Sequence, residues 1–426
     1  MDEDVAAERP PPRYVLDAGC GAGIIGICAA AAILAIETEQ LLVRTQDRDE
    51  LARRVTLFNA EKNHIPSAAL ESYTEPLLAG PENARWDLIL SNIPAKAGTP
   101  VLEDFIRRSA GLLKPGGRVI MVAVHTLADF FREQIKVAGA ELIREETSTE
   151  HSVFVYHVNA AAIAANGQAA AAKAPAKPAA CAPLMAGVGF LEKYPFYIRN
   201  SADYQIEEIP LHLKTVHGAS GFDDPGGAVL AVAKLIRRLG PENIYPGTDP
   251  LKGMSHNWPL LIHESGQGFF PCWLLEFLRR ENRLPPAASL TLPPAMVLSG
   301  RNILALEAAR HNTAAVLKTS AQPEPAIVPA VDLRLGGGAL LETTAGQKYG
   351  FIAVFPELLP QSSLPKEADQ LAALWQSLTS LLAPGGVFIA AFGSTDAERF
   401  DRKKPAGFIR LGDIKRKGFR ALGYKC

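Results

Sequence analysis

A glycine-rich loop near the start of the chain carries the residues best suited to hold a small charged ligand. The apolar run Tyr14–Leu16 leads into Asp17, then into three alternating glycines, Gly19, Gly21 and Gly23, and then into an apolar helical stretch. Glycines let a backbone turn sharply and approach a ligand closely, and the first N–H groups of the next helix are free to bind it. The alternative interpretation is a strand–helix turn with a structural role only.

The type of ligand depends on Asp17. The loop also contains the spacing G-x-G-x-x-G, at Gly21, Gly23 and Gly26, which is a weak sign of dinucleotide binding. A carboxylate at the end of the first strand would repel a pyrophosphate, but it suits the cationic methionine end of S-adenosylmethionine. The sequence therefore favours S-adenosylmethionine as the cofactor.

Further polar residues end the next two predicted strands. Asp47 ends the second, where a carboxylate can accept hydrogen bonds from both hydroxyls of a ribose. Asp47 could instead cap the following helix, although Asp49 is the better placed cap. Ser72 and Tyr73 end the third strand, where the adenine edge would lie. An exposed loop tyrosine without a ligand is the alternative interpretation.

The predicted strands alternate with helices at first and then end in a hairpin. This order predicts an α/β fold with a mostly parallel, Rossmann-like sheet of seven strands and an antiparallel terminal hairpin. The predicted strands are Tyr14–Ala18, Leu41–Gln46, Ala68–Ser72, Trp86–Ser91, Arg118–Val124, Ala140–Glu146 and Ser152–His157.

A fourth motif, Ser91-Asn92-Ile93-Pro94, ends the fourth strand, and the turn 114–117 precedes the fifth. With the glycine loop and Asp47, these segments resemble the methyltransferase small-domain group of class I S-adenosylmethionine-dependent methyltransferases. Its best-known members are ribosomal RNA guanine-N2 methyltransferases with two tandem domains. The resemblance covers most of 14–158 and, more loosely, 209–426.

The resemblance implies roles for individual residues. Methylation of an exocyclic amino group requires that its nitrogen be held in line with the methyl donor, which the Asn92 oxygen could do while Pro94 fixes the loop. The family pattern has a second proline and an aromatic residue where this chain has Ile93 and Ala95. The predicted catalytic residues are Asn92 and Pro94, and the predicted cofactor-binding residues are Asp17, Gly19, Gly21, Gly23, Asp47, Ser72, Tyr73 and Asn92.

The length of 426 residues predicts two domains. We expect a catalytic domain over residues 1–158, an Ala- and Pro-rich linker over 159–183, and a second domain of the same fold over 184–426. The turn Leu112–Gly117 recurs as Leu381–Gly386, which indicates an internal duplication.

The second domain is expected to be a degenerate copy. We match Glu264 to Asp17, and Gly266 and Gly268 to Gly19 and Gly21; Phe270 then replaces Gly23, Gly300 replaces Asp47, and Phe355 replaces Asn92. These replacements predict a scaffolding or RNA-binding role without catalysis. The segment Gly221–Gly227 has no counterpart before Tyr14, so we expect either an upstream start codon or a cofactor site open on one side.

Composition sets the remaining expectations. A net charge of −1 gives no global attraction to nucleic acid or membranes, and the five cysteines are scattered without zinc-ligand spacing. We expect a cytoplasmic protein without metal or membrane partners. The C-terminal tail predicts local RNA contact, because cations bind phosphates and aromatic rings stack on bases. Its cations and aromatic residues are Arg402, Lys403, Lys404, Arg410, Lys415, Arg416, Lys417, Arg420, Lys425, Phe400, Phe408, Phe419 and Tyr424.

Three hypotheses remain open from the sequence. The first is an RNA methyltransferase that acts on an exocyclic base nitrogen, guanine N2 by resemblance. The second is a methyltransferase for a small molecule or a protein, which Ile93 and Ala95 favour slightly. The third is a non-catalytic RNA-binding protein, which the presence of Asp17, Asp47 and Asn92 opposes.

Overall fold

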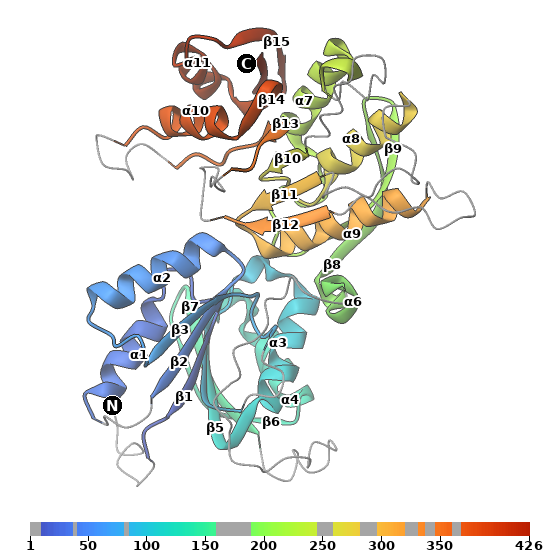
Figure 1. Ribbon diagram of the computed structural model, residues 1–426. Helices are drawn as coiled ribbons and strands as arrows, with labels where there is room; N and C mark the ends of the chain where they lie inside the picture. The colour runs from blue at the N-terminus through green and yellow to red at the C-terminus, as the bar shows by residue number, and fades with distance from the viewer. Residues whose placement is uncertain are drawn as a thin grey trace. The chain divides into compact units, whose positions relative to one another are not determined.

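The chain forms two compact units, Met1–Val188 and Gly189–Cys426, and each is described by itself (Figure 1). The computed structural model describes residues 10–36, 41–80, 85–158, 189–244, 259–281, 296–319, 331–336, 346–359 and 368–426. The predicted linker, 159–183, lies outside the described residues, so it stays a prediction.

The N-terminal unit contains one seven-stranded sheet in the order β3-β2-β1-β4-β5-β7-β6. Strands β1 to β5 pair in parallel, and β7 runs antiparallel to both β5 and β6. The expected parallel sheet with an antiparallel terminal hairpin is confirmed. The strands are β1 Tyr14–Ala18, β2 Leu42–Asp47, β3 Leu70–Thr74, β4 Trp86–Asn92, β5 Leu113–Val124, β6 Ala140–Thr147 and β7 His151–Val158.

Helices cover both faces of this sheet, with α1 and α2 on one side and α3 and α4 on the other (Figure 1). Under α1, the strand residues Val15 and Val43 are buried against Ile27 and Ala30. This packing fixes the loop between β1 and α1 at the carboxyl end of the sheet. The helices are α1 Ile24–Leu34, α2 Glu50–Lys62, α3 Thr99–Gly111 and α4 Ala128–Val137, with short 3-10 turns at Ala95–Ala97 and His125–Leu127.

Two strands of the N-terminal unit differ from their predicted bounds by more than one residue. Strand β3 ends at Thr74, two residues later than predicted, and β5 begins at Leu113 rather than at Arg118. The predicted turn 114–117 instead lies inside β5, where the pairing with β4 shifts register between Trp86 and Leu88. The turn predicted at 114–117 is therefore a β-bulge within a continuous strand, because the residues on both sides of it pair with β4.

The C-terminal unit repeats the sheet, in the order β12-β11-β10-β13-β14-β16-β15. Matching each strand in turn gives the same topology as the N-terminal unit, so the duplicated fold is confirmed. Its main elements are β10 Leu260–His263, α8 Phe269–Arg280, β11 Met296–Gly300, α9 Ile303–Thr319, β12 Val331–Leu335, β13 Tyr349–Val354, α10 Gln370–Leu381, β14 Leu382–Gly393, α11 Ser394–Arg402, β15 Ile409–Arg416 and β16 Phe419–Lys425.

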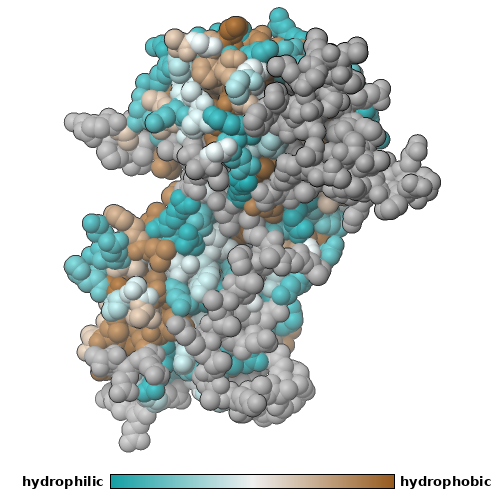
Figure 2. Space-filling view, viewed as in Figure 1, coloured by the Kyte–Doolittle hydropathy of each residue, from teal (hydrophilic) through white to brown (hydrophobic). Residues whose placement is uncertain are grey.

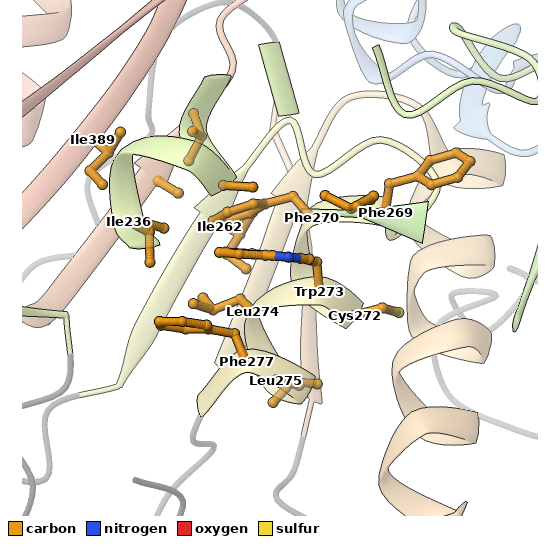
Figure 3. Close-up of a cluster of buried hydrophobic side chains, with 14 of the residues drawn as sticks. Ile236, Ile262, Phe269, Phe270, Cys272, Trp273, Leu274, Leu275, Phe277 and Ile389 are labelled. Carbon is orange, nitrogen blue, oxygen red and sulfur yellow. The ribbon is translucent and has the colours of Figure 1, made fainter. Parts of the chain in front are cut away.

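Additional elements precede this second sheet. A hairpin of β8 and β9 packs against α8 and α9, and α7 packs against β14, β15 and β16. Beneath them, Phe270, Trp273 and Phe277 of α8 lie in one buried cluster with Ile262 of β10 (Figure 3). The described residues of the N-terminal unit contain no counterpart of the hairpin or of α7. These elements are α6 Phe190–Lys193, β8 Ile198–Ile206, β9 Ile209–Val216 and α7 Gly226–Leu239, with short 3-10 turns at Pro195–Tyr197 and Pro241–Asn243.

Candidate active site

The glycine loop Gly19–Gly23 joins β1 to α1 at the carboxyl end of the sheet. Gly19, Gly21 and Gly23 have φ values of 79°, 54° and 81°, which side chains other than glycine rarely adopt. The N–H of Gly19 donates to the carbonyl of Gln46 at 2.8 Å, so the loop is tied to the end of β2. A side chain at Gly23 would also meet the Thr56 methyl at 2.5 Å.

Asp47 ends β2 and holds the same loop from the side. One carboxylate oxygen accepts the Gly21 N–H at 3.1 Å, and the other accepts the Asp49 N–H at 3.0 Å. Asp49 caps α2 by accepting the Leu51 N–H at 2.9 Å, so the alternative role of Asp47 as the helix cap is excluded. The partly exposed Asp47 carboxylate therefore faces the loop, and its role toward a ribose remains a prediction.

Asp17 is fully buried at the end of β1, beneath α1. Its Oδ2 accepts the Gly26 N–H at 2.8 Å, whereas Oδ1 is buried without a hydrogen-bond partner among the described residues. Burial raises the pKa of Asp17 to about 6; the bond from Gly26 lowers it in part, and the nearby Asp47 charge adds to the rise. A buried carboxylate oxygen without a partner is costly and calls for an explanation.

The second glycine loop shows which positions correspond. Both loops end on a left-handed glycine that caps the next helix, Gly23 with φ 81° and Gly268 with φ 98°. Three residues earlier, the Cys20 and Ser265 carbonyls accept the N–H groups of these glycines. Glu264, with φ 54°, therefore occupies the left-handed position of the first glycine in the loop.

Four of the predicted correspondences, those of Glu264, Gly266, Gly268 and Phe270, are thus wrong by two residues. Gly266 and Gly268 correspond to Gly21 and Gly23. Glu264 takes the place of Gly19, and Ile262 takes the place of Asp17. Phe270 corresponds to Ile25 and not to a loop glycine, so it does not crowd the loop. The error arose because the glycines were matched by spacing alone, which cannot show that a glutamate has replaced a left-handed glycine.

The corrected correspondence shows which residues of the C-terminal unit stand in place of Asp17 and its hydrogen-bond donor. In the C-terminal unit its counterpart is the apolar Ile262, and the counterpart of Gly26, which donates to Asp17, is Pro271, which has no N–H to donate. The same strand, loop and helix therefore form without the carboxylate. Asp17 is therefore not needed to build this turn, and its role in cofactor binding stays a prediction.

The matches for Asp47 and Asn92 agree with the structure. In the strand pairing, Gly300 follows Ser299 of β11 in the same way that Asp47 follows Gln46 of β2, so Gly300 and Asp47 correspond. The Glu264 carboxylate now lies beside Gly300, 3.2 Å from where a side chain there would begin, and it accepts the Arg301 N–H at 3.1 Å. A carboxylate therefore lies near Gly300 in the C-terminal unit, but it follows β10 and not β11.

Ser72 and Tyr73 lie within β3 and not at its end. Register pairs Ser72 with Thr45 and Tyr73 with Gln46, and the Ser72 hydroxyl is buried without a hydrogen-bond partner in the described part of the chain. The Tyr73 hydroxyl donates to Glu71, and burial followed by this acceptor raises the pKa of Tyr73 to about 12. Their proposed place at an adenine edge stays a prediction.

The loop after β3 was missed by the sequence reasoning. Its Glu75 carboxylate pairs with the buried Arg44 at 2.5 Å, and the Gln46 amide donates to the Leu77 carbonyl and, at 3.0 Å, to the Ala79 carbonyl. The Leu77 side chain lies 3.4 Å from where a side chain on Gly19 would begin. This loop therefore closes over the glycine loop. Its one signal in the sequence was the pair of opposite charges on Arg44 and Glu75, and their spacing does not show that they are buried together.

Asn92 and Pro94 lie at the carboxyl end of β4, next to the end of β1. The Ser91 hydroxyl donates to the Ala18 carbonyl at 2.7 Å, which locks the two strand ends together. Asn92 is exposed, and its side chain makes no hydrogen bond with the described residues; Pro94 is also exposed, whereas Ile93 is buried. The topology thus brings Asn92 to the same edge as the glycine loop. Its catalytic role is untested.

The C-terminal tail differs from the predicted basic surface. Phe400, Phe408 and Tyr424 belong to a buried cluster around Trp375, so they cannot stack on bases. Residues 189–426 carry 26 Lys and Arg against 22 Asp and Glu. Acidic neighbours pair with many of the tail cations: Arg402 with Glu398, Lys403 with Asp369, Arg410 with Asp401 and Asp413, Arg416 with Glu207, and Arg420 with Asp413.

Neither a metal-binding cluster nor a membrane-spanning helix is found among the described residues. No group of three or more His, Cys, Asp or Glu side chains is placed to hold a metal ion. Within the same residues, no helix combines the length and the apolar composition that a membrane span requires.

Comparison with known proteins finds a family match and several relatives for the N-terminal unit. Residues 5–137 match the family described as methyltransferase small domain. A ribosomal protein L11 methyltransferase of Janthinobacterium sp. is 32% identical over 157 residues, which cover 36% of this chain and 44% of that protein. Ribosomal RNA small subunit methyltransferase C of Hamiltonella defensa is 33% identical over 120 residues, covering 27% of this chain and 32% of that protein. The chain thus spans less than half the length of these relatives.

One solved structure resembles the whole chain. It is the T. thermophilus 16S rRNA N2 guanine methyltransferase in complex with AdoMet and guanosine, with 15% sequence identity and a TM-score of 0.57. The match covers 99% of this chain and 90% of that one. At this identity the likeness concerns the fold, and it agrees with two tandem units of one architecture.

Proposed function

We propose that the N-terminal unit, in which residues 5–137 match the methyltransferase small domain family, is an S-adenosylmethionine-dependent methyltransferase. Its proposed substrate is an exocyclic nitrogen of an RNA base, with guanine N2 of ribosomal RNA as the first choice and the cytoplasm as the location. The names of the relatives that methylate ribosomal RNA support this choice.

The buried Asp17 carboxylate carries the proposal. Its Oδ1 has no hydrogen-bond partner among the described residues, and the same fold is built with Ile262 at this position. When bound, S-adenosylmethionine supplies a methyl group on a positively charged sulfur, next to an ammonium group. Asp17 and Asp47 supply negative charge beneath and beside the glycine loop, which suits such a cation and opposes a pyrophosphate.

The chain's own contribution to the reaction would be positioning. Asn92 stands at the end of β4, with an exposed amide whose oxygen can accept a hydrogen bond from an amino group. Ser91 locks the ends of β1 and β4, so the amide is held at a fixed place relative to the glycine loop. Holding an amino nitrogen in line with a good leaving group accounts for most of the barrier reduction that this reaction needs.

The C-terminal unit is proposed to scaffold or bind RNA without catalysis. Its counterpart of Asp17 is Ile262, and its counterpart of Asn92 is Phe355. Neither side chain supplies a carboxylate for an ammonium group or an amide oxygen for an amino group. RNA binding by this unit cannot depend on the buried tail aromatics.

A second candidate is methylation of a protein or a small molecule. Ile93 is buried and Ala95 has no ring, so neither can stack on a base. The L11 methyltransferases among the relatives are named for a protein substrate, which favours a protein over a small molecule.

Transfer of a tritiated methyl group tests the substrate. Wild-type protein would be incubated with labelled S-adenosylmethionine, ribosomal RNA from a strain that lacks the gene, and ribosomal proteins from the same strain. We expect label in RNA, and loss of that label with Asn92→Ala while the cofactor still binds. Label in protein alone would establish the second candidate, and label in neither would reject both.

A further inference from the structure

A chain of hydrogen bonds leads from His125, the first residue after β5, to a carboxylate on β6. The ring Nδ1 lies 3.1 Å from the hydroxyl of Ser152, which is fully buried in β7, and this hydroxyl lies 3.3 Å from the Thr147 hydroxyl. Thr147 donates to a Glu145 oxygen at 3.2 Å, and Arg132 of α4 donates to both oxygens of Glu145 at 2.8 Å each. His125 is exposed, so a solvent-facing imidazole is connected through two hydroxyls to a carboxylate.

The carboxylate fixes the direction of each bond in this chain. The bonds from Arg132 lower the pKa of Glu145, so at neutral pH its oxygens accept hydrogen bonds and donate none. Thr147 uses its one hydrogen on Glu145, so Ser152 must donate to Thr147. The Ser152 oxygen then accepts the hydrogen on Nδ1 of His125. The neutral ring therefore carries its lone pair on Nε2, which makes no hydrogen bond with the described residues.

The turn that begins with His125 packs against α4 and β7. Arg132 is paired with both Asp129 and Glu145, so its charge is balanced. After Arg132, His125 also lowers the pKa of Glu145, so a protonated His125 and this carboxylate attract each other. The charged and titratable residues that α4, β6, β7 and the β6–β7 turn bring to this end of the sheet are Asp129, Arg132, Glu145, Glu146, Glu150 and His151.

The C-terminal unit builds the same turn without this chain. His125 follows β5 and donates its N–H to a carbonyl of the β6–β7 turn at 2.8 Å, and its counterpart Ser394 follows β14 and donates its N–H to a carbonyl of the β15–β16 turn at 3.2 Å. The Ser394 hydroxyl turns back to that same carbonyl, and the strand pairings place Arg420 where Ser152 stands. The chain is therefore not needed to form the turn, and it occurs in the unit that carries the proposed methyl-transfer site.

His125 lies at the same edge of the sheet as Asn92. The Ile93 N–H donates to the Val122 carbonyl of β5 at 3.0 Å, and His125 comes three residues after Val122. With neighbouring strands about 5 Å apart and about 3.3 Å per residue, the Cα atoms of Asn92 and His125 are roughly 10 Å apart. Side chains that reach toward each other across this gap can hydrogen-bond to one amino group between them.

Other groups of this edge are less suited to accept a proton. Asp47 already accepts the N–H groups of Gly21 and Asp49, and Asp17 lies buried beneath α1. α1 contains no acidic residue and no histidine, and Figure 2 shows apolar residues gathered over this helix. His125 therefore offers this edge an exposed nitrogen with a lone pair.

We propose that His125 accepts the proton that the acceptor nitrogen loses in methyl transfer, an inference that rests on the proposed function. The nitrogen lone pair forms a bond to the methyl carbon, and the carbon–sulfur bond breaks with its electron pair on sulfur. One proton of the nitrogen passes to Nε2 of His125, and the chain through Ser152 stabilises the imidazolium at Nδ1 until solvent takes the proton. Proton transfer to a positioned side chain accelerates reactions by about 100- to 10,000-fold.

The tautomer of His125 tests the chain of hydrogen bonds without any need for activity. Nitrogen-15 NMR of the full chain, labelled at histidine, reports which ring nitrogen carries hydrogen, and the signal missing from His125→Gln identifies His125. We expect hydrogen on Nδ1 in wild type at pH 8 and a shift toward Nε2 in Ser152→Ala, because imidazole in water prefers hydrogen on Nε2. A wild-type ring with its hydrogen on Nε2 would overturn the proposal.

Single-turnover transfer of a tritiated methyl group tests the role of His125. The probe is ribosomal RNA from a strain that lacks the gene, at saturating S-adenosylmethionine and between pH 5 and pH 9. The wild-type rate should rise about tenfold per pH unit at the acid end, because a protonated imidazole accepts no proton. His125→Gln should be about a hundredfold slower at pH 8 and should lose this rise. His157→Gln, at the opposite end of β7, should match wild type.

An unchanged rise in His125→Gln would mean that another group, such as Asp17, titrates, and it would overturn the proposal; a variant as fast as wild type would do the same. Transfer by none of the chains, wild type included, would instead reject the proposed function, and this inference with it. Equal thermal melting of wild type and variants would show that the variants fold.

Discussion

The buried Asp17 carboxylate couples the stability of the N-terminal unit to its proposed cofactor site. Burial raises the pKa of Asp17 from 3.8 to about 6 in the folded chain. Below pH 4 the group is protonated in the folded and unfolded chains, and above pH 6 it is charged in both. The folded chain binds more protons between these values, so the free energy of unfolding falls as the pH rises through this window. The full loss is about 3 kcal/mol, since one pKa unit is worth about 1.4 kcal/mol.

Asp17→Asn removes this cost and keeps an oxygen to accept the Gly26 N–H. Urea unfolding at pH 8 should show the variant to be more stable than wild type by about 1 to 3 kcal/mol, and the difference should shrink toward zero near pH 4. S-adenosylmethionine binding at pH 8 should weaken at the same time, because the variant lacks the negative charge that suits the cationic cofactor. A residue that serves binding can thus lower the stability of the fold. Asp129→Asn, whose carboxylate is fully exposed, serves as the control. A variant less stable than wild type at pH 8 would show that burial of the Asp17 charge does not destabilise the fold.

Three further substitutions test the site and its support. Asn92→Ala should lower kcat by about a hundredfold and weaken the cofactor Kd much less, because its amide acts mainly on the acceptor; steady-state kinetics with calorimetry would check this, and a cofactor Kd weakened as strongly as kcat would argue against it. Gly23→Ala should destabilise the fold by about 1 to 3 kcal/mol in urea unfolding, because φ is 81° and the new methyl would meet Thr56; wild-type stability would contradict the loop geometry. Arg44→Met should cost about 3 to 5 kcal/mol by removing the guanidinium from the buried Glu75 carboxylate, and adding Glu75→Leu should restore most of it; a double variant no better than the single one would exclude the pairing as the cause.

Much of the fold follows from local patterns in the sequence. The alternation of apolar runs with helical stretches located each strand of the N-terminal unit to within a few residues, and β1 was predicted with its observed bounds. The short turn before β7 indicated the antiparallel hairpin, because so few residues cannot cross back over a sheet. The places of Asp47 and Asn92 followed as well, since both stand at strand ends.

Other features depend on contacts that a sequence does not display. Glu264 replaces a glycine in the left-handed conformation, and nothing in the local sequence distinguishes it from a strand-end acid such as Asp17. The tail aromatics Phe400 and Tyr424 pack around Trp375, so their alternation with cations reflected a core and not a binding surface. The loop that closes over Gly19 is held by Arg44 and Glu75, which lie 31 residues apart.

Calorimetric titration with S-adenosylmethionine tests directly whether the N-terminal unit alone binds the cofactor. We expect one site per chain for wild type, loss of that site in Asp47→Ala, and an unchanged site in Glu264→Ala, which removes the carboxylate at the corresponding corner of the C-terminal unit. Two sites per chain, no site at all, or a site lost in Glu264→Ala and kept in Asp47→Ala would contradict this expectation.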